Sequence, residues 1–299
     1  MPQASQSSED KILDNKNLYF DSVTILGVGL IGASLALALR EKKLCGRIFG
    51  FGRREENLRR AKELGIINDY SLDPVEACID SELIVLATPV GLFRDIVGDI
   101  KGFLKPGALI TDVGSVKGPL VYELEAMLPE GVSFVGCHPI AGSEQSGIED
   151  ARSDLFRNAL CVVTPGEKSD MKIVQSVALM WEGLGCRVEY MNPYTHDEIF
   201  SAVSHFPHMA AYALVNAVND LDPGYLKYAG QGFRDTTRIA VSSPELWRDI
   251  SLANRDNLLK LTELFIAELK KMRDLLESED GPGLEKKFDR ARKLREKLM

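Results

Sequence analysis

The stretch "SVTILGVGLIGASLALAL", residues 22–39, joins an apolar run to a glycine-rich turn and then to a helical pattern. Gly27, Gly29 and Gly32 have the spacing G-x-G-x-x-G. Between a strand and a helix this spacing is typical of a dinucleotide-binding turn: the first glycine permits a tight turn, the second lets the backbone approach a pyrophosphate, and the third lets the helix pack closely. The phosphates then lie at the helix N-terminus, where free N–H groups attract anions. A tight turn without a ligand is the alternative interpretation.

Short apolar runs alternate with helical patterns as far as about Asn192. Continuous apolar runs between helices are typical of parallel strands that are covered on both faces. The sequence therefore predicts a doubly wound, Rossmann-type α/β domain with a parallel sheet over residues 21–192. The predicted strands are 22–26, 47–52, 82–88, 108–114, 133–136, 159–165 and 186–191.

The pattern of apolar residues changes at about residue 193. After this point strand patterns are absent from the sequence and helical periodicity dominates. Residues 196–220 and 244–278 each read as a helix, and the "GPG" at 281–283 ends the second one. We therefore expect an all-helical substrate and dimerisation domain over 193–299. Its high apolar content for so few helices favours a homodimer, and the polar residues 1–20 read as a loose tail.

Composition narrows the class of protein. The 36 basic and 44 acidic residues give a net charge of −8, which argues against a nucleic-acid partner. No apolar run approaches the roughly 20 residues that span a membrane, so we expect no membrane partner. The five cysteines show no paired spacing, which favours free thiols in the cytoplasm and no metal site.

The residues after the second strand bear on the choice of cofactor. An acidic residue there would accept the ribose hydroxyls of NAD, but Gly52 occupies the position and Arg53 and Arg54 follow. The expected cofactor is NAD(P). Arginine suits a 2′-phosphate, which favours NADP, whereas the nearby Glu55 and Glu56 weaken this preference. Alternatively, the arginines merely begin an exposed helix. The predicted cofactor-binding residues are Gly27, Gly29, Leu30, Ile31, Gly32, Arg53, Arg54, Thr88 and Pro89.

Two polar residues follow predicted strands on the edge where ligands of an open α/β sheet bind. His138 comes after the strand 133–136, and Ser115 comes after the strand 108–114. Imidazole titrates near neutral pH, so His138 could accept a proton near a nicotinamide. A loop histidine bonded to the backbone is an equally good interpretation of its position alone.

Five segments together resemble the prephenate/arogenate dehydrogenase family of tyrosine biosynthesis, in the family's order and over roughly residues 20–270. They are "GVGLIGASLALALR", "TDVGSVKG", "CHPIAGSEQSG", "SHFPH" and "GFRDTTRIAVSSPELWRDI". The resemblance implies NAD(P)-dependent oxidative decarboxylation of prephenate to 4-hydroxyphenylpyruvate and carbon dioxide. It also implies a nucleotide-binding domain followed by a helical dimerisation domain.

The resemblance also assigns residue roles. His138 draws the proton from the ring hydroxyl of the substrate, and Ser115 orients that hydroxyl and the histidine. Arg238 binds a substrate carboxylate, which a guanidinium can do through two parallel bonds. One departure is Arg234, where the family often has lysine. The implied substrate-binding residues are His208, Arg238, Glu144, His205 and Trp247.

Three other functions stay open at this point. An arogenate or dual-specificity cyclohexadienyl dehydrogenase differs only in a side-chain amino or keto group of its substrate. A β-hydroxyacid dehydrogenase or imine reductase shares the predicted architecture, and Lys227 would be available as its acid/base group. A non-catalytic, nucleotide-sensing dimer would need the glycine turn but not His138, Ser115 and Arg238 together.

Overall fold

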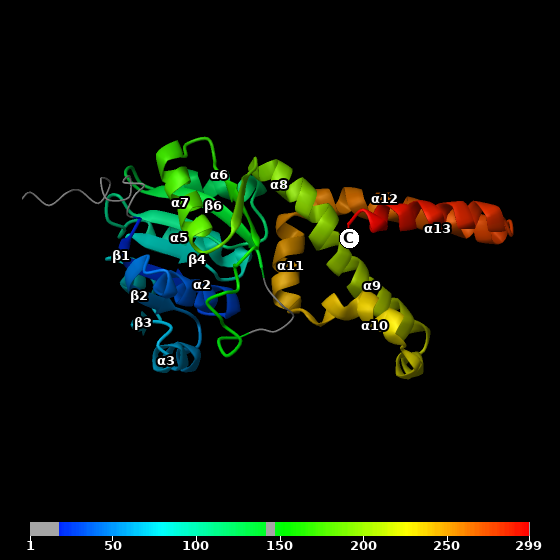
Figure 1. Cartoon of the computed structure of the whole chain (residues 1–299), viewed down its shortest axis with the longest axis horizontal. Coiled ribbons are helices and arrows are strands. Elements are labelled where there is room, and N and C mark those ends of the chain that lie inside the picture. Colours follow the sequence, from blue (N-terminus) through cyan, green and yellow to red (C-terminus); the bar gives the residue numbers. More distant parts are fainter. Residues whose placement is uncertain (1–17, 142–146, 299) are drawn as a thin grey trace, which may run out of the picture. The chain divides into compact units, whose positions relative to one another are not determined.

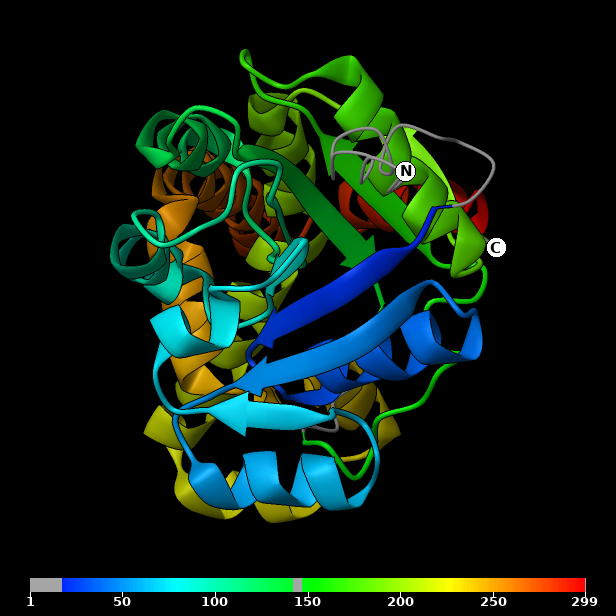
Figure 2. The ribbon, with the colours of Figure 1, turned by 90° about the vertical axis from the view of Figure 1, so that its left-hand side faces the viewer.

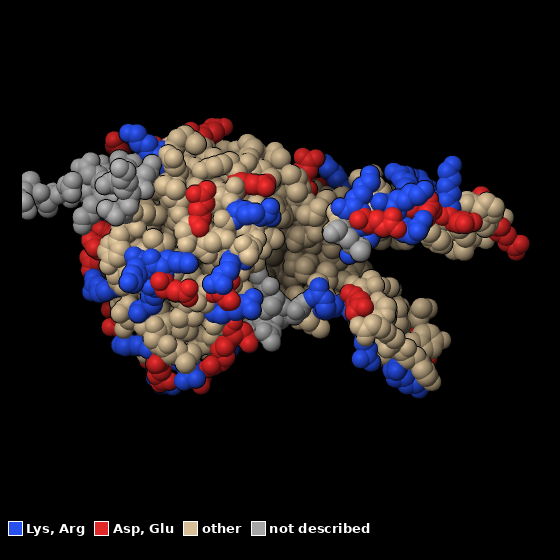
Figure 3. Space-filling view, viewed as in Figure 1, with Lys and Arg blue, Asp and Glu red and all other residues tan. Residues whose placement is uncertain are grey.

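The computed structural model describes residues 18–141 and 147–298. The chain divides into two compact units, Met1–Asn254 and Arg255–Met299. Among the described residues, no helix is long and apolar enough to cross a membrane. Basic and acidic side chains are interspersed over the face of the first unit in Figure 3, without a large patch of either sign.

The first unit is built on an eight-stranded sheet with the order β3-β2-β1-β4-β5-β6-β7-β8. The six strands β3, β2, β1, β4, β5 and β6 run parallel to one another, and Figure 2 shows β1, β2 and β3 side by side. This mostly parallel sheet confirms the predicted fold class. The strands are β1 (Phe20–Leu26), β2 (Cys45–Phe51), β3 (Asp69–Ser71), β4 (Leu83–Leu86), β5 (Leu109–Asp112), β6 (Ser133–Ile140), β7 (Leu160–Thr164) and β8 (Arg187–Tyr190).

The last strands depart from the expected all-parallel order. β7 runs antiparallel to β6, and β8 is parallel to β7. A parallel neighbour needs a long crossover, usually a helix, and the described part of the β6–β7 connection, residues 147–159, contains none. The pairing with β7 extends β6 to Ile140. His138 therefore lies within the strand, opposite Val162, and not after it as we expected.

Helices cover both faces of the sheet, as a doubly wound domain requires (Figure 1). On one face α2 and α7 pack on the strands, with Leu35 and Trp181 in the buried cluster. On the other face α5 and α6 contribute Phe93 and Leu124 to a second cluster. These helices and the shorter ones are α2 (Leu30–Glu41), α3 (Glu55–Glu63), α4 (Pro74–Cys78), the 3-10 turn η1 (Val90–Leu92), α5 (Phe93–Ile100), α6 (Gly118–Met127) and α7 (Met171–Gly183).

Helices alone follow β8 among the described residues. Asn192 caps α8 by accepting hydrogen bonds from the backbone of Tyr194 and Thr195. A π-helical segment, η2, then joins α8 directly to α9. The helical elements of this part of the first unit are α8 (Pro193–Phe200), η2 (Ser201–His205), α9 (Phe206–Leu221), η3 (Pro223–Tyr228), α10 (Gln231–Thr237), η4 (Arg238–Val241) and α11 (Pro244–Ala253).

The second unit consists of α12 (Arg255–Glu277) and α13 (Gly281–Glu296), which pack on each other. Lys287 of α13 pairs with Glu268 of α12. The single helix expected over 244–278 is interrupted at Asn254, and the "GPG" segment forms the first turn of α13. Of the predicted tail, residues 1–17 lie outside the described part of the chain.

Candidate active site

The glycine turn has the geometry that a dinucleotide requires. Gly27 has φ of 110°, and a Cβ there would lie 2.5 Å from the carbonyl carbon of Ala87. A Cβ on Gly32 would overlap the carbonyl oxygen of Gly27, whereas a Cβ on Gly29 would meet nothing within 4 Å. The N-terminus of α2 has no side-chain cap and no acidic residue in its first turn. These features leave its N–H groups suited to an anion.

The other predicted cofactor residues surround this turn. Leu30 and Ile31 begin α2, and both are half-buried. Thr88 and Pro89 follow β4, the neighbour of β1, after one intervening residue, Ala87. The buried hydroxyl oxygen of Thr88 has no hydrogen-bond partner among residues 18–141 and 147–298. The residues present therefore fit a bound dinucleotide.

The end of β2 carries the residues that we connected with NADP. Arg53 is exposed and pairs with Glu245 of α11 at 3.4 Å. Arg54 directly precedes α3 and makes no side-chain cap hydrogen bond, and Glu55 accepts a hydrogen bond of 3.3 Å from the Tyr70 hydroxyl. A Cβ on Gly52 would be in ordinary contact with Leu58, at 3.5 Å. A side chain at position 52 is therefore sterically possible.

The first unit brings all four histidines of the chain into one group. Nδ1 of His138 lies 2.8 Å from Nε2 of His196, and Nδ1 of His196 lies 2.8 Å from Oδ1 of Asp197. The Asn254 side chain donates to the carbonyl of Asp197 at 2.8 Å and lies 3.0 Å from Nδ1 of His205. The group thus links β6, α8, the π segment and the residue after α11.

The fourth histidine continues this group towards α11. His208 stacks on Trp247 with ring centroids 3.5 Å apart, and Trp247 lies edge-on to His205 at 6.2 Å. Nδ1 of His208 donates to the carbonyl of Ser204 at 2.9 Å, so its Nε2 is left as the acceptor atom of a neutral ring. His208 is half-buried and can meet a ligand, whereas His205 is fully buried.

A buried ion pair holds the loop that carries Ser115. Nζ of Lys117 lies 2.6 Å from Oδ2 of Asp112, and both side chains are 1% exposed. Lys117 also donates to the carbonyl of Gly114 at 2.6 Å. Ser115 itself is half-buried between β5 and α6, within this fixed loop. The two predicted catalytic residues therefore lie at the carboxyl end of β5 and in the neighbouring strand β6.

Burial makes every histidine in the group less basic than usual. It lowers the pKa of His138 well below 6.5, and the nearby His196, Lys117 and His205 act in the same direction. Burial also lowers the pKa of His196 and His208, and it brings the pKa of His205 to about 4. At neutral pH the group therefore consists of neutral imidazoles, which accept protons and hydrogen bonds.

The remaining predicted residues have different placements. Arg238 begins the turn η4, which packs on α9, and its side chain is exposed. Trp247 is carried by α11, whose Ile250 is buried in the core cluster beside α5 and α6. Glu144 lies outside the described residues.

Sequence reasoning missed four residues of the group. They are His196, Asp197, Lys117 and Asn254. Lys117 belongs to the "GSVKG" motif, which was a usable signal. The other three carry no motif that we recognised, although polar residues with 0–4% exposure, as these have, imply a partner.

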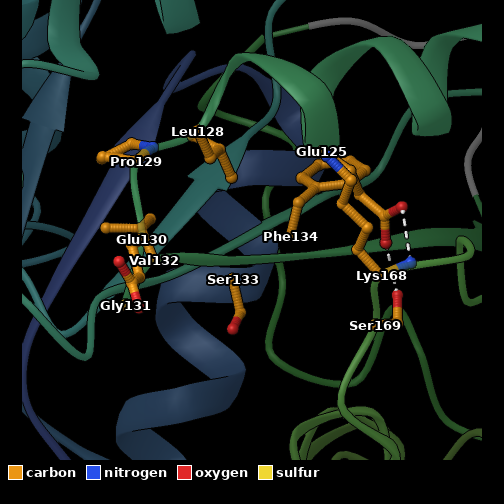
Figure 4. A pocket seen from close by; sticks show the side chains of 10 residues that line it. All are labelled: Glu125, Leu128, Pro129, Glu130, Gly131, Val132, Ser133, Phe134, Lys168 and Ser169. Carbon is orange, nitrogen blue, oxygen red and sulfur yellow. Dashed lines mark hydrogen bonds between the residues drawn. The ribbon is translucent and has the colours of Figure 1, made fainter.

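Other features lie apart from this group. Within residues 18–141 and 147–298, no cluster of His, Cys, Asp or Glu could hold a metal ion. Figure 4 shows a pocket at the amino end of β6, the opposite edge of the sheet from the glycine turn. Its buried Glu125 already accepts hydrogen bonds from the Ser169 hydroxyl and the Lys168 backbone N–H.

Comparison with known proteins matches both parts of the chain to one family. Residues 35–190 match the model "Prephenate dehydrogenase, nucleotide-binding domain", and residues 192–290 match "Prephenate dehydrogenase, dimerization domain". Prephenate dehydrogenase of Bacillus subtilis is 36% identical, covering 93% of this chain and 76% of that protein. Cyclohexadienyl dehydrogenase of Zymomonas mobilis is 32% identical, covering 92% of this chain and 95% of that protein.

A solved structure agrees with these relatives. Prephenate dehydrogenase from Aquifex aeolicus, in complex with hydroxyphenyl propionate and NAD+, is 38% identical. The two structures align with a TM-score of 0.88, covering 93% of this chain and 98% of that one. The chain belongs to the prephenate dehydrogenase family and is an NAD(P)-dependent oxidoreductase.

Proposed function

We propose that the substrate is prephenate, which is oxidised and decarboxylated to 4-hydroxyphenylpyruvate and carbon dioxide. One observation carries this proposal: His138 is buried at the carboxyl edge of the sheet, three strands from the glycine turn of β1, and its burial lowers its pKa. That placement suits a base beside a hydride acceptor. Arogenate is the alternative substrate, because a cyclohexadienyl dehydrogenase is among the relatives.

A bound nicotinamide dinucleotide supplies the hydride acceptor. Nε2 of His138 takes the proton of the ring hydroxyl, because Nδ1 already faces His196. Ser115 orients this hydroxyl from a loop that Lys117 fixes to Asp112. Loss of carbon dioxide makes the ring aromatic, which drives the reaction forward.

The substrate carboxylates need cationic and hydrogen-bonding partners. We assign Arg238 to one carboxylate, His208 and Trp247 to the ring region, and Glu144 to the mouth of the site. Because His205 is fully buried, it acts through Asn254 and the nearby backbone of Ser115 and does not touch the substrate.

We propose that the chain forms a homodimer through its helical part. In this proposal residues 21–192 are the dinucleotide-binding domain and residues 193–299 are the substrate and dimerisation domain. The two family models meet between residues 190 and 192, which supports this division. Large apolar side chains of α12, such as Leu259, Leu264 and Leu269, are 49–67% exposed. A second copy would cover such a surface. The cytoplasm is the proposed location.

Replacement of the proposed base should separate catalysis from binding. We expect His138→Asn to lower kcat by roughly 10²–10⁴, the usual contribution of a positioned base, with dinucleotide affinity unchanged. Steady-state kinetics with prephenate and with arogenate, together with fluorescence titration of NADH and NADPH, measure both quantities. A variant with near-normal turnover would exclude the proton-acceptor role. A wild-type protein that oxidises neither substrate would exclude the proposed function.

Arg238 offers a test of substrate binding. Arg238→Gln should raise KM for prephenate strongly and change kcat less, because it removes a contact common to the ground state and the transition state. Arg234→Gln is the matched control, since Arg234 is also exposed and donates from Nε to the Ala229 carbonyl. Equal effects of the two substitutions on KM would argue against a specific carboxylate contact.

Cofactor preference is proposed to favour NADP. Gly52 offers no carboxylate to repel a 2′-phosphate, and Arg54 is the better candidate partner because Glu245 already pairs with Arg53. A charge-assisted hydrogen bond of about 1.5–3 kcal/mol predicts roughly a tenfold preference or more. Gly52→Asp should lower the ratio of kcat/KM for NADP to kcat/KM for NAD. Arg54→Ala should lower kcat/KM for NADP and leave kcat/KM for NAD unchanged. Arg59→Ala, on the same helix, is the control, and a wild-type preference for NAD would refute the proposal.

The pH dependence of kcat/KM should reflect the buried base. His138 must be neutral to accept a proton, and burial holds its pKa well below 6.5. The rate should therefore stay level as pH falls from 8 to 6.5, about the value of an ordinary histidine, and decline only at lower pH. Circular dichroism at each pH controls for unfolding. An acidic midpoint at or above 6.5 would contradict this expectation.

A further inference from the structure

We propose that His196 and Asp197 are positioning residues that hold His138 in the tautomer with its proton on Nδ1 and its lone pair on Nε2. The inference rests on the proposed role of His138 as proton acceptor. It adds two residues to that reaction, neither of which belongs to the glycine turn or contacts the proposed substrate carboxylates. Its basis is the continuous series of hydrogen bonds from His138 through His196 to Asp197.

The direction of each bond follows from the carboxylate. An ionised Asp197 can only accept, so Nδ1 of His196, 2.8 Å away, must donate. A neutral His196 then has no proton on Nε2, which becomes an acceptor. Nδ1 of His138, 2.8 Å from that atom, must therefore donate. The remaining nitrogen of His138, Nε2, is left with a lone pair.

The surroundings hold Asp197 in its accepting role. Its Oδ1 accepts a second bond, of 2.7 Å, from the backbone N–H of Lys117. Its Oδ2 lies against Gly118, where a Cβ would be only 2.5 Å away. These atoms form the start of α6, and the N-terminal end of a helix favours a negative charge. The backbone carbonyl of Asp197 is held separately by Asn254.

The rings have little freedom to escape this arrangement. His196 is fully buried and Asp197 is 2% exposed, so water cannot replace a lost partner. The ring of Phe200 lies 4.5 Å from that of His196 and 4.8 Å from that of His138. With the other tautomer of His138, two lone pairs would face each other at 2.8 Å. A buried polar atom without a partner is costly, so this tautomer is disfavoured.

The arrangement also serves the protonated state. When Nε2 of His138 takes a proton, the new positive charge is shared with a ring that is hydrogen-bonded to Asp197. Lys117 and His205 oppose this charge from neighbouring elements, and Asp112 is the other carboxylate near His196. The same logic operates in the Ser-His-Asp triad, where a buried carboxylate fixes the tautomer of the catalytic histidine.

Nitrogen NMR can read the tautomers directly, because the full chain contains only four histidines. In the wild-type protein labelled with ¹⁵N-histidine at neutral pH, we expect His138 and His196 both to carry the proton on Nδ1. Spectra of His138→Asn and His196→Gln assign the signals. A proton on Nε2 of His138 overturns the proposal. This readout does not depend on turnover, so it remains decisive even if neither prephenate nor arogenate is a substrate.

Kinetics distinguish positioning from a merely structural role. His196→Leu removes the acceptor, and we expect kcat to fall by roughly 10²–10⁴ with KM and NADPH affinity unchanged. His196→Gln can place its amide oxygen near the position of Nε2 and should lose less than tenfold. Asp197→Asn keeps an oxygen for Lys117 but removes the charge, so kcat should also fall. Equal losses in the leucine and glutamine variants, or wild-type kcat in the leucine variant, would refute the positioning role.

Discussion

The ion pair between Asp112 and Lys117 is the interaction on which the site depends. Both side chains are 1% exposed, and the second oxygen of Asp112 accepts a 2.9 Å bond from the backbone N–H of Cys137, next to His138. One carboxylate thus joins the end of β5, the Ser115 loop and β6. Burial raises the pKa of Asp112, although Lys117 opposes the shift. Keeping the two charges buried therefore carries a desolvation penalty. Removing either partner would leave an uncompensated buried group, which is why the pair fixes one arrangement of the loop.

The same lysine connects the sheet to the helices that follow it. Its backbone N–H binds Asp197, and this contact docks α8 on the start of α6. From α8 the chain runs without a break through the π segment into α9. Such segments are rare and occur frequently at functional sites. Here it ends at the buried His205, while His208, one turn later, remains partly exposed beside Trp247. The contact between Lys117 and Asp197 therefore helps to determine how deeply His205 and His208 are buried.

Much of the fold could be predicted because its signals are local. The G-x-G-x-x-G turn and the apolar runs each depend on neighbouring residues, and the sheet confirms them. Strand direction is different: an apolar run such as that of β7 is buried equally well parallel or antiparallel to β6, so its pattern carries no direction. The helix break at Asn254 was also invisible, because neither glycine nor proline marks it. Asn254 is placed there by tertiary bonds to Asp197 and His205.

From the sequence, only the site residues at the carboxyl ends of the strands could be predicted. The rule that ligands bind beyond the carboxyl ends of strands identified Ser115 and His138. It could not identify His196 and Asp197, because two polar residues near a helix start usually face water. Their partners lie 58 and 80 residues away in the sequence. The proposed boundary at 192/193 therefore passes through the site. His138, the proposed base, lies before it, and Asp197, which we propose to orient that base, lies after it. Neither part of the chain holds the proposed proton acceptor in its working tautomer without the other.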